Sequence, residues 1–335
     1  MNKDTITSLH TFYLIVFLSF KEHRNQKVGG KKVRIKKFLC MSLGIMVIAG
    51  GLVGCGADTS STTGTSSGTA AAAVTKSSIS GTVVGSGSSA LLPLAQNAAD
   101  KFKDSYPDIS VTLNAGGSGT GLKQVADGTV DIGNSDVEAA SKLEAAQASA
   151  LVDHKVCVIA MATVVNKDVA ATVKSLTKQQ LVDIFTAKTT NWKDVGGPDE
   201  KIILVTRPTT SGTRALFKEF ALNNTDEASN ASLETDDSGT LLQNVSDNKG
   251  AIGYVALSYL INNTKVSTLA IDGVDPTLAN TYSGKYPVWG YEHMYTKGAP
   301  KEAVKAYLDY ILSSDYATQI EAQGYCVTSK MTVTR

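Results

Sequence analysis

Short apolar runs of strand length alternate with amphipathic runs of helix length from about residue 80 to the C-terminus of this 335-residue chain. The runs typical of strands are 81–84, 109–113, 130–132, 156–165, 202–205, 251–255 and 288–295. Those typical of helices are 91–106, 121–127, 176–185, 211–221 and 301–312. This alternation predicts an α/β fold with largely parallel strands. Because the units are too many for one small sheet, we expect two lobes.

Three turns rich in glycine, serine and threonine follow expected strands, and each opens a helix. They are 85–90, 116–121 and 207–214. Each places free backbone N–H groups and short hydroxyls at a helix N-terminus, where the helix dipole also favours negative charge. One such turn is what any helix cap would use. Ligands of open α/β sheets bind at the C-terminal ends of the strands, so three turns together predict a shared anion site.

The ligand is expected to be a small bare anion. The turn 116–121, Gly-Gly-Ser-Gly-Thr-Gly, lacks the Gly-Lys-Ser/Thr ending of a nucleotide-binding P-loop and the G-x-G-x-x-G spacing of a dinucleotide site. Residues 55–335 hold 23 basic and 29 acidic residues, and no basic cluster occurs beyond residue 37. We therefore expect no nucleic-acid partner.

Two charged residues narrow the choice of anion. Arg207 ends an expected strand, where its guanidinium could donate to two oxyanion oxygens, although a surface ion pair is the alternative. Asp136 also follows a strand, and its alternative role is a helix N-cap; we expect Asp131 to be structural. A carboxylate can accept the hydrogen of protonated phosphate, whereas sulfate carries none. A site built around a required hydrogen bond can discriminate against an analogue that lacks the hydrogen by a factor of ~10⁴–10⁵.

The N-terminus has the pattern of an export signal. Five basic residues in 31–37 precede an apolar run, 38–53, that is short for a membrane span. The run ends Leu-Val-Gly before Cys55, which resembles the bacterial lipobox. We expect Cys55 to be diacylated and to anchor the protein on the outer face of the cytoplasmic membrane; the alternative is an uncleaved membrane anchor. Residues 1–30 are not typical of the beginning of an export signal, and we expect that the start codon has been assigned too far upstream.

The segment 57–80 is almost entirely Ser, Thr, Gly and Ala and is expected to be a flexible tether. Outside the cell, Cys157 and Cys326 could form a disulfide or remain as buried thiols, and their spacing does not decide between the two. No Cys/His cluster has zinc-ligand spacing, so we expect no metal and no cofactor.

Four motifs resemble those of phosphate-binding proteins of the high-affinity phosphate ABC importer, and they occur in the same order. The motifs are 85–90, 116–121, 131–136 and 211–214. Segments 177–197 and 250–254 are also similar. The resemblance implies a two-lobed type II periplasmic-binding-protein fold, with a hinge and an interlobe cleft that closes around phosphate. It places 80–155 plus 290–335 in lobe 1 and 156–289 in lobe 2.

Carried over motif by motif, the resemblance implies a phosphate site. Its residues would be Ser88, Ser89, Ala90, Ser118, Asp136, Arg207, Ser211, Gly212 and Thr213. Where some members have an aromatic residue this chain has Ala90, whose backbone N–H would serve. No role is implied for Trp289 or His293.

The implied function is capture of inorganic phosphate by a monomeric lipoprotein and its delivery to an ABC permease and ATPase. A binder of another oxyanion, such as sulfate, and a phosphate-sensing surface lipoprotein remain alternatives. A phosphatase or phosphoryl transferase would need a nucleophile with a base or a metal pair. No histidine lies near any of the three turns, so we expect no catalytic residue.

Overall fold

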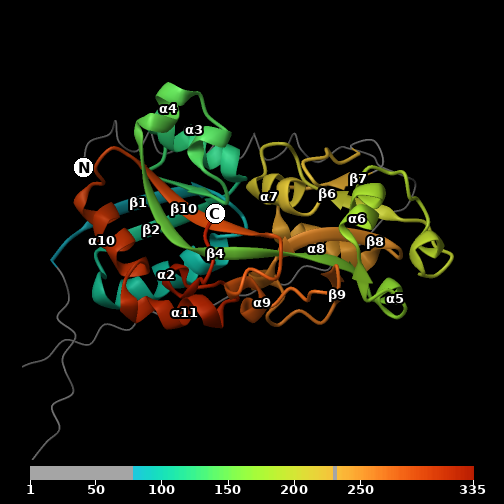
Figure 1. Ribbon diagram of the computed structural model, residues 1–335. Helices are drawn as coiled ribbons and strands as arrows, with labels where there is room; N and C mark the ends of the chain where they lie inside the picture. Colours follow the sequence, from blue (N-terminus) through green and yellow to red (C-terminus); the bar gives the residue numbers. More distant parts are fainter. Residues whose placement is uncertain (1–77, 229–231) are drawn as a thin grey trace, which may run out of the picture. The chain divides into compact units, whose positions relative to one another are not determined.

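The structure, a computed structural model, describes residues 78–228 and 232–335 (Figure 1). The expected export signal, Cys55 and nearly all of the expected tether lie outside the described residues. Within the described ranges, no helix is long and apolar enough to cross a membrane.

The first sheet region has the strand order β2-β1-β3-β10-β4. The bounds are β1 (Gly81–Gly87), β2 (Ile109–Ala115), β3 (Ile132–Ser135), β4 (Leu151–Asn166) and β10 (Trp289–Lys297). β1 is parallel to both β2 and β3. The C-terminal ends of these three strands therefore meet at one edge, and the segments that follow them lie there.

The second sheet region is built on the C-terminal part of β4. Its other strands are β5 (Ser175–Leu176), β6 (Ile203–Thr206), β7 (Ser232–Glu234), β8 (Ala251–Ala256) and β9 (Val266–Ile271). β4 pairs with β10 over residues 151–160 and with β8 over residues 161–165. This one long strand runs through both regions (Figure 1).

The strand directions are mixed. β6 is parallel to β7 and β8, as β1 is to β2 and β3. The two long strands differ: β10 is antiparallel to β3 and β4, and β4 is antiparallel to β8 and β9. The expectation of largely parallel strands therefore fits the outer strands and is wrong for β4 and β10.

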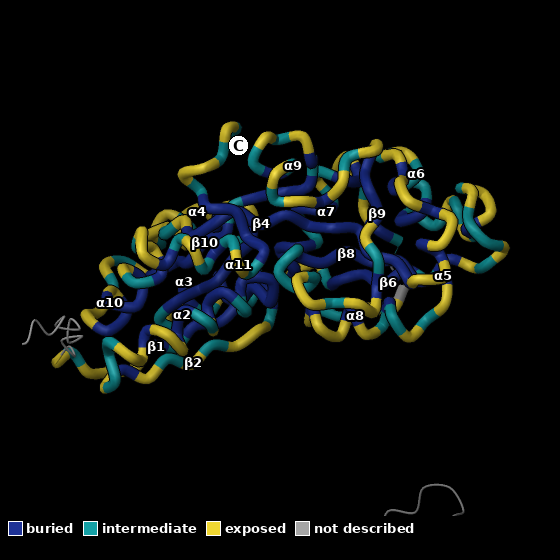
Figure 2. The backbone as a smooth tube through the Cα atoms, turned by 90° about the horizontal axis from the view of Figure 1, so that it is seen from below, coloured by how far each residue is buried: buried dark blue, intermediate teal, exposed yellow. Residues whose placement is uncertain are grey.

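Helices cover the faces of the sheet, with buried strands between them (Figure 2). Their bounds are α2 (Leu92–Ser105), α3 (Ser118–Asp127), α4 (Ala145–Ser149), α5 (Lys167–Ala170), α6 (Lys178–Phe185), α7 (Gly212–Phe220), α8 (Ser238–Asp247), α9 (Leu278–Tyr282), α10 (Glu302–Ile311) and α11 (Ala317–Ala322). The apolar face of α2 that includes Leu94, Ala98 and Phe102 is buried. Tyr307 of α10 packs edge-to-face on Phe102 and donates to the carbonyl of Ala95 at 2.8 Å.

The sequence suggested no element between residues 221 and 251, yet helix α8 occupies part of that segment. Its sequence is rich in Ser, Gly, Thr and Asn, which are poor helix formers. Asp237 caps its start by accepting from the N–H of Thr240 at 2.7 Å. Leu241, Leu242 and Val245 are buried, so tertiary packing stabilises a helix that local propensity does not indicate.

Cys157 and Cys326 are both buried free thiols. The backbone of Cys326 forms a bridge with Val158, the neighbour of Cys157 on β4. The structure therefore decides between the two alternatives in favour of free thiols.

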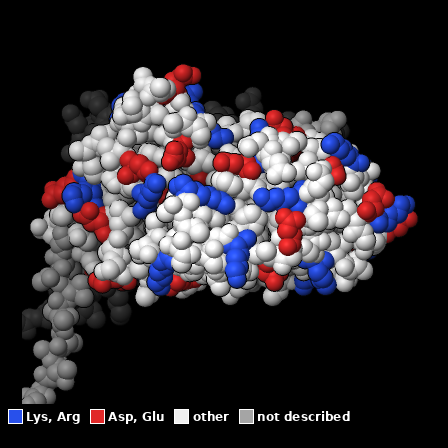
Figure 3. Space-filling view, in the orientation of Figure 1, with Lys and Arg blue, Asp and Glu red and all other residues white. Residues whose placement is uncertain are grey.

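Basic and acidic side chains are interspersed over the face drawn in Figure 3. That face carries no broad basic stripe of the kind that nucleic-acid binders present.

Candidate functional site

The structure brings the three glycine- and hydroxyl-rich turns together. The N–H groups of Gly116 and Gly117 donate to the carbonyl of Gly87 at 3.0 and 2.9 Å, joining the turns after β1 and β2. The N–H of Gly119 donates to the carbonyl of Thr210 at 2.9 Å, joining the turns after β2 and β6. These turns open α2, α3 and α7, so three helix N-termini lie in one neighbourhood.

Arg207 is fully buried, with 0% of its surface exposed. Its Nη1 donates to the carbonyl of Asp236 at 3.0 Å and its Nη2 to Ser238 Oγ at 2.9 Å. Its Nε has no hydrogen-bond partner among the described residues, and none of their carboxylates forms an ion pair with it. The surface ion-pair alternative is therefore wrong. A buried cation with no carboxylate in direct contact is costly, so the site favours an anion.

Tyr254 and Arg214 contact Arg207, and Glu227 supports it through Arg214. Its guanidinium lies 5.8 Å from the ring centroid of Tyr254, and its carbonyl accepts from Arg214 Nη1. Arg214 Nε in turn lies 3.6 Å from a carboxylate oxygen of Glu227, which is 6% exposed. Burial raises the pKa of Glu227 to about 7, against the lowering effects of Tyr254 and Arg214.

Asp136 lies just beyond β3 and is 2% exposed. Its Oδ2 accepts from Thr213 Oγ1 at 2.8 Å, and its backbone N–H donates to Ser118 Oγ at 3.0 Å. Its Oδ1 is buried without a hydrogen-bond partner in the described part of the chain. The 3₁₀ turn that follows has Glu138 at its N-cap, so Asp136 is not that cap. The free oxygen can accept one more hydrogen bond.

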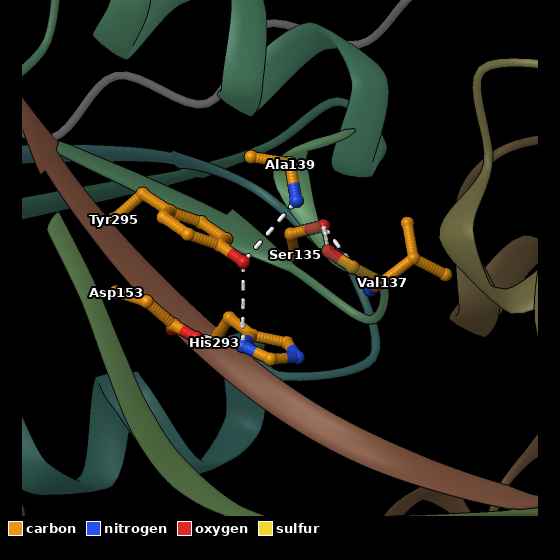
Figure 4. A network of polar contacts seen from close by, with 6 residues as sticks. All are labelled: Ser135, Val137, Ala139, Asp153, His293 and Tyr295. Atoms are coloured by element: carbon orange, nitrogen blue, oxygen red, sulfur yellow. Dashed lines mark hydrogen bonds and ion pairs between the residues drawn. The ribbon is translucent and has the colours of Figure 1, made fainter. Parts of the chain in front are cut away.

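A hydrogen-bond network fixes the turn that carries Asp136 (Figure 4). Ser135 Oγ donates to the carbonyl of Val137 at 2.6 Å, and the N–H of Ala139 donates to the hydroxyl of Tyr295 at 3.2 Å. His293 Nδ1 lies 2.8 Å from an Asp153 carboxylate oxygen and 3.5 Å from the Tyr295 hydroxyl. His293, which the sequence left without a role, thus supports the turn through β10.

The first turn uses its hydroxyls in two ways. Ser88 Oγ accepts from the N–H groups of Ala90 and Leu91, each at 3.0 Å, so the expected donor of Ala90 is already engaged. Ser89 Oγ instead crosses to the segment before α8, donating to the carbonyl of Asp236 at 3.0 Å and lying 3.0 Å from Ser238 Oγ. Ser88 therefore shapes the turn, while Ser89 lies beside the partners of Arg207.

The third turn packs tightly on the second. Ser211 caps α7 by accepting from the N–H of Arg214 at 3.3 Å. Gly212 is so close to Ser118 that a Cβ at position 212 would lie 2.2 Å from Ser118 Oγ. Glycine is required there because the backbone approaches so closely. The expected residues Ser118, Asp136, Gly212 and Thr213 thus form one contact cluster.

Sequence reasoning missed Asp236 and Ser238, which bridge Arg207 to Ser89. The segment Asp-Asp-Ser-Gly-Thr at 236–240 has the composition of the other helix-opening turns and could have revealed them. Burial raises the pKa of Asp236, while Arg207 opposes that shift. Tyr259, also missed, donates from its hydroxyl to the carbonyl of Ser89 at 2.8 Å.

Comparisons with known proteins identify the family of the chain. Residues 62–315 match a family model described as the PBP superfamily domain. The phosphate-binding protein PstS of Bacillus subtilis is 49% identical over 257 residues, which cover 76% of this chain and 84% of the relative. A putative phosphate ABC transporter substrate-binding protein with bound phosphate from Clostridium perfringens is 30% identical, with a TM-score of 0.67, covering 74% of this chain and all of that one. An ABC-type phosphate transport receptor from Vibrio cholerae is 25% identical, with a TM-score of 0.58, over 73% of this chain and 99% of that one. The chain therefore belongs to the PstS family of phosphate-binding proteins, within the PBP superfamily.

Proposed function

We propose that this protein binds inorganic phosphate outside the cytoplasm and delivers it to the permease of an ABC importer, without catalysing a reaction. The observation that carries the proposal is Arg207, a fully buried guanidinium that forms no ion pair with the described residues. It lies beside turns that open α2, α3 and α7. The names of the family's members support phosphate as the anion.

In this proposal the anion is held by donors of three kinds. Arg207 supplies charge and the free Nε, Ser118 and Ser211 supply hydroxyl donors, and the backbone at Gly212 supplies an amide at the start of α7. Ser89 and Thr213, whose hydroxyls donate to the Asp236 carbonyl and to Asp136, hold the turns around the anion. Ser88 and Ala90 contribute by shaping the first turn. Helix N-termini add favourable partial charge at the oxyanion oxygens. Burial of a doubly charged anion is tolerable only when its oxygens are saturated in this way.

Asp136 would distinguish phosphate from sulfate. At neutral pH phosphate carries hydrogen, and the unpartnered Oδ1 of Asp136 can accept it. Sulfate carries no hydrogen at neutral pH, so one of its oxygens would lie against the Asp136 carboxylate without a hydrogen bond. The buried carboxylate would therefore reject sulfate by repulsion as well as by a missing hydrogen bond.

We place residues 80–155 plus 290–335 in one lobe and 156–289 in the other, joined through β4 and β10. Four contacts support a closed arrangement: Thr213 with Asp136, Ser89 with Asp236, Gly119 with Thr210, and Lys142 Nζ with the Thr209 carbonyl at 2.9 Å. Each joins a turn of one lobe to a turn of the other. Because closure completes the anion's shell, the importer can recognise the loaded form.

The export pattern and the cysteine at 55 support a lipid-anchored monomer on the outer face of the cytoplasmic membrane. The low-complexity segment after Cys55 would give the binding domain freedom to reach the permease.

Isothermal titration calorimetry with the purified protein tests the proposal. We expect phosphate to bind at one site and a large excess of sulfate to leave that binding unchanged. Tight sulfate binding would contradict the role of Asp136. Absence of phosphate binding would contradict the function as a whole.

A further inference from the structure

Glu292 lies on β10, outside every motif that pointed to the anion site. It is 0% exposed, and neither of its carboxyl oxygens has a hydrogen-bond partner within the described ranges. A buried carboxyl group without a partner costs folding free energy. The groups that lie next to Glu292 therefore have to account for its burial.

The strand register places Glu292 against Asp136. In the antiparallel pair of β3 and β10, His293 is opposite Ser135 and Met294 is opposite Asn134. Continuing this register by one residue puts Glu292 opposite Asp136, where directly opposed residues have their Cβ atoms about 4.5–5.5 Å apart on the same face. Asp136 Oδ1 is also buried and unpartnered among the described residues. Two carboxyl groups, each with at least one buried oxygen that has no hydrogen-bond partner among the described residues, are thus neighbours.

A β-bulge in β4 lies opposite this point of β10, with Val156 as the extra residue. Glu292 is paired with Cys157 of β4, whereas the next residue, His293, is paired with Lys155. Bulges bend a strand and change the direction of a side chain, and they are frequent next to functional sites. The bulge lies directly beside the residue that faces Asp136.

The ionisable groups facing Glu292 include no cation of the described chain. They are Asp136 from the turn after β3, Cys157 from β4 and Tyr325 from the C-terminal segment. Burial first, and the neighbouring Asp136 second, raise the pKa of Glu292 well above its ordinary value. The Thr213 hydroxyl donates to Asp136, whereas no described group donates to Glu292, so Glu292 is the member of the pair whose charge nothing stabilises.

We propose that Glu292 is a positioning residue whose protonated carboxyl donates a hydrogen bond to Asp136. A carboxylate offers about four acceptor sites, so Asp136 can accept from Glu292 and Thr213 and still receive the hydrogen of a bound phosphate. The bond fixes the orientation of the Asp136 carboxyl group. A neutral Glu292 also adds no second negative charge beside the anion. This inference rests on the proposed phosphate binding.

Infrared spectroscopy of the purified protein at pH 8, with and without phosphate, tests the protonation. We expect the C=O stretching band of a protonated carboxylic acid in the native protein, and we expect Glu292→Gln to remove it. Glu227→Gln is the matched control, because Glu227 is a second buried glutamate whose pKa is raised only to about 7. If the band is absent from both the native protein and Glu227→Gln, the proposal is overturned, even if Glu292→Gln does not fold.

Calorimetry with two substitutions tests the positioning. Glu292→Met keeps the length and removes the donor, so phosphate affinity should fall about tenfold and the preference for phosphate over sulfate should shrink. Glu292→Gln restores a donor and should recover most of both. Equal losses in the two variants, or no loss in either, would refute the role of the hydrogen bond. Failure of the native protein to bind phosphate would instead contradict the proposed function.

Discussion

Thr213 Oγ1 donates to Asp136 Oδ2 at 2.8 Å and so connects the first turn of α7 to the turn after β3. Both residues are buried, at 2% exposure each. The bond joins segments 77 residues apart, one following a strand of each sheet region. The carboxylate proposed to select the ligand is therefore also a contact that holds the two regions together.

Asp136→Asn should weaken phosphate binding and reduce the preference for phosphate over sulfate. The asparagine amide has one acceptor oxygen where the carboxylate has two, so it cannot accept from Thr213 on one oxygen and from the ligand's hydrogen on the other. It also no longer repels an unprotonated oxyanion. We expect phosphate affinity to fall about 10- to 100-fold, since a hydrogen bond to a charged group is worth roughly 1.5–3 kcal/mol. Competition calorimetry with both anions measures the ratio. An unchanged ratio would remove Asp136 from the selection of the ligand.

Arg207→Ala should abolish measurable phosphate binding. Truncating one partner of a buried, hydrogen-bonded charge pair costs about 2–5 kcal/mol or more, which is at least about 30-fold in affinity. Arg207→Lys should recover only part, because an ammonium cannot reproduce the fork that reaches Asp236 and Ser238. Lys305→Ala, at an exposed ion pair on α10, is the control and should bind phosphate as the native protein does. Retained affinity in Arg207→Ala would contradict the proposed site.

Gly212→Ala should weaken phosphate binding by keeping the two lobes apart. The new Cβ would lie 2.2 Å from Ser118 Oγ and 3.0 Å from Asp136 Cβ, and overpacking of this kind costs typically 1–3 kcal/mol, or about 5- to 150-fold in affinity. The matched control is Gly239→Ala at the start of α8, where the nearest atom to the new Cβ is Asp237 Oδ1 at 3.3 Å. Small-angle scattering with and without phosphate would report closure. A Gly212→Ala protein that closes and binds normally would contradict the steric argument.

The sequence predicted the parts of the site that depend on local patterns. Arg207 and the turns before α2, α3 and α7 are recognisable because apolar strands end in Gly, Ser and Thr, which have few other reasons to occur there together. The sequence did not predict α8, because Leu241, Leu242 and Val245 stabilise it only after they pack on the sheet.

Glu292 shows why other features of the site stay hidden in the sequence. A single glutamate in an apolar strand has no local partner, and its neighbour Asp136 is 156 residues earlier in the chain. Their proximity depends on the register of β3 and β10 and on the antiparallel direction of β10, which alternation of strands and helices did not predict. Register is a tertiary property, so only the structure reveals the pair.

Cys157 and Cys326 should remain unreactive in the native protein and react fully once it is unfolded. Burial raises the pKa of the Cys326 thiol to about 12 and that of the Cys157 thiol well above its ordinary value, so neither forms the reactive thiolate. Thiol titration of the chain from Gly56 onward, with and without denaturant, measures both states. An unfolded protein that yields no thiol without a reductant would show a disulfide instead.

Glu227 should make the native state less stable as the pH rises from about 5 to 8. Its folded pKa of about 7 lies above the ordinary 4.5, because burial outweighs the effects of Tyr254, Arg214 and Arg207. The native state therefore binds more protons than the unfolded chain between these values. The stabilisation is complete below pH 4.5 and disappears as the pH rises through 7. A shift of this size corresponds to about 3 kcal/mol.

Urea unfolding of the native protein and Glu227→Gln at pH 5, 6, 7 and 8 isolates the effect, since all other groups titrate alike in both. The difference in unfolding free energy between the two proteins should move against the native one by roughly 2–3 kcal/mol across this range. If the unfolding free energies of the two proteins instead change in parallel with pH, the prediction is wrong. Arg214, whose Nε lies 3.6 Å from the carboxylate, would then compensate the burial of an ionised Glu227.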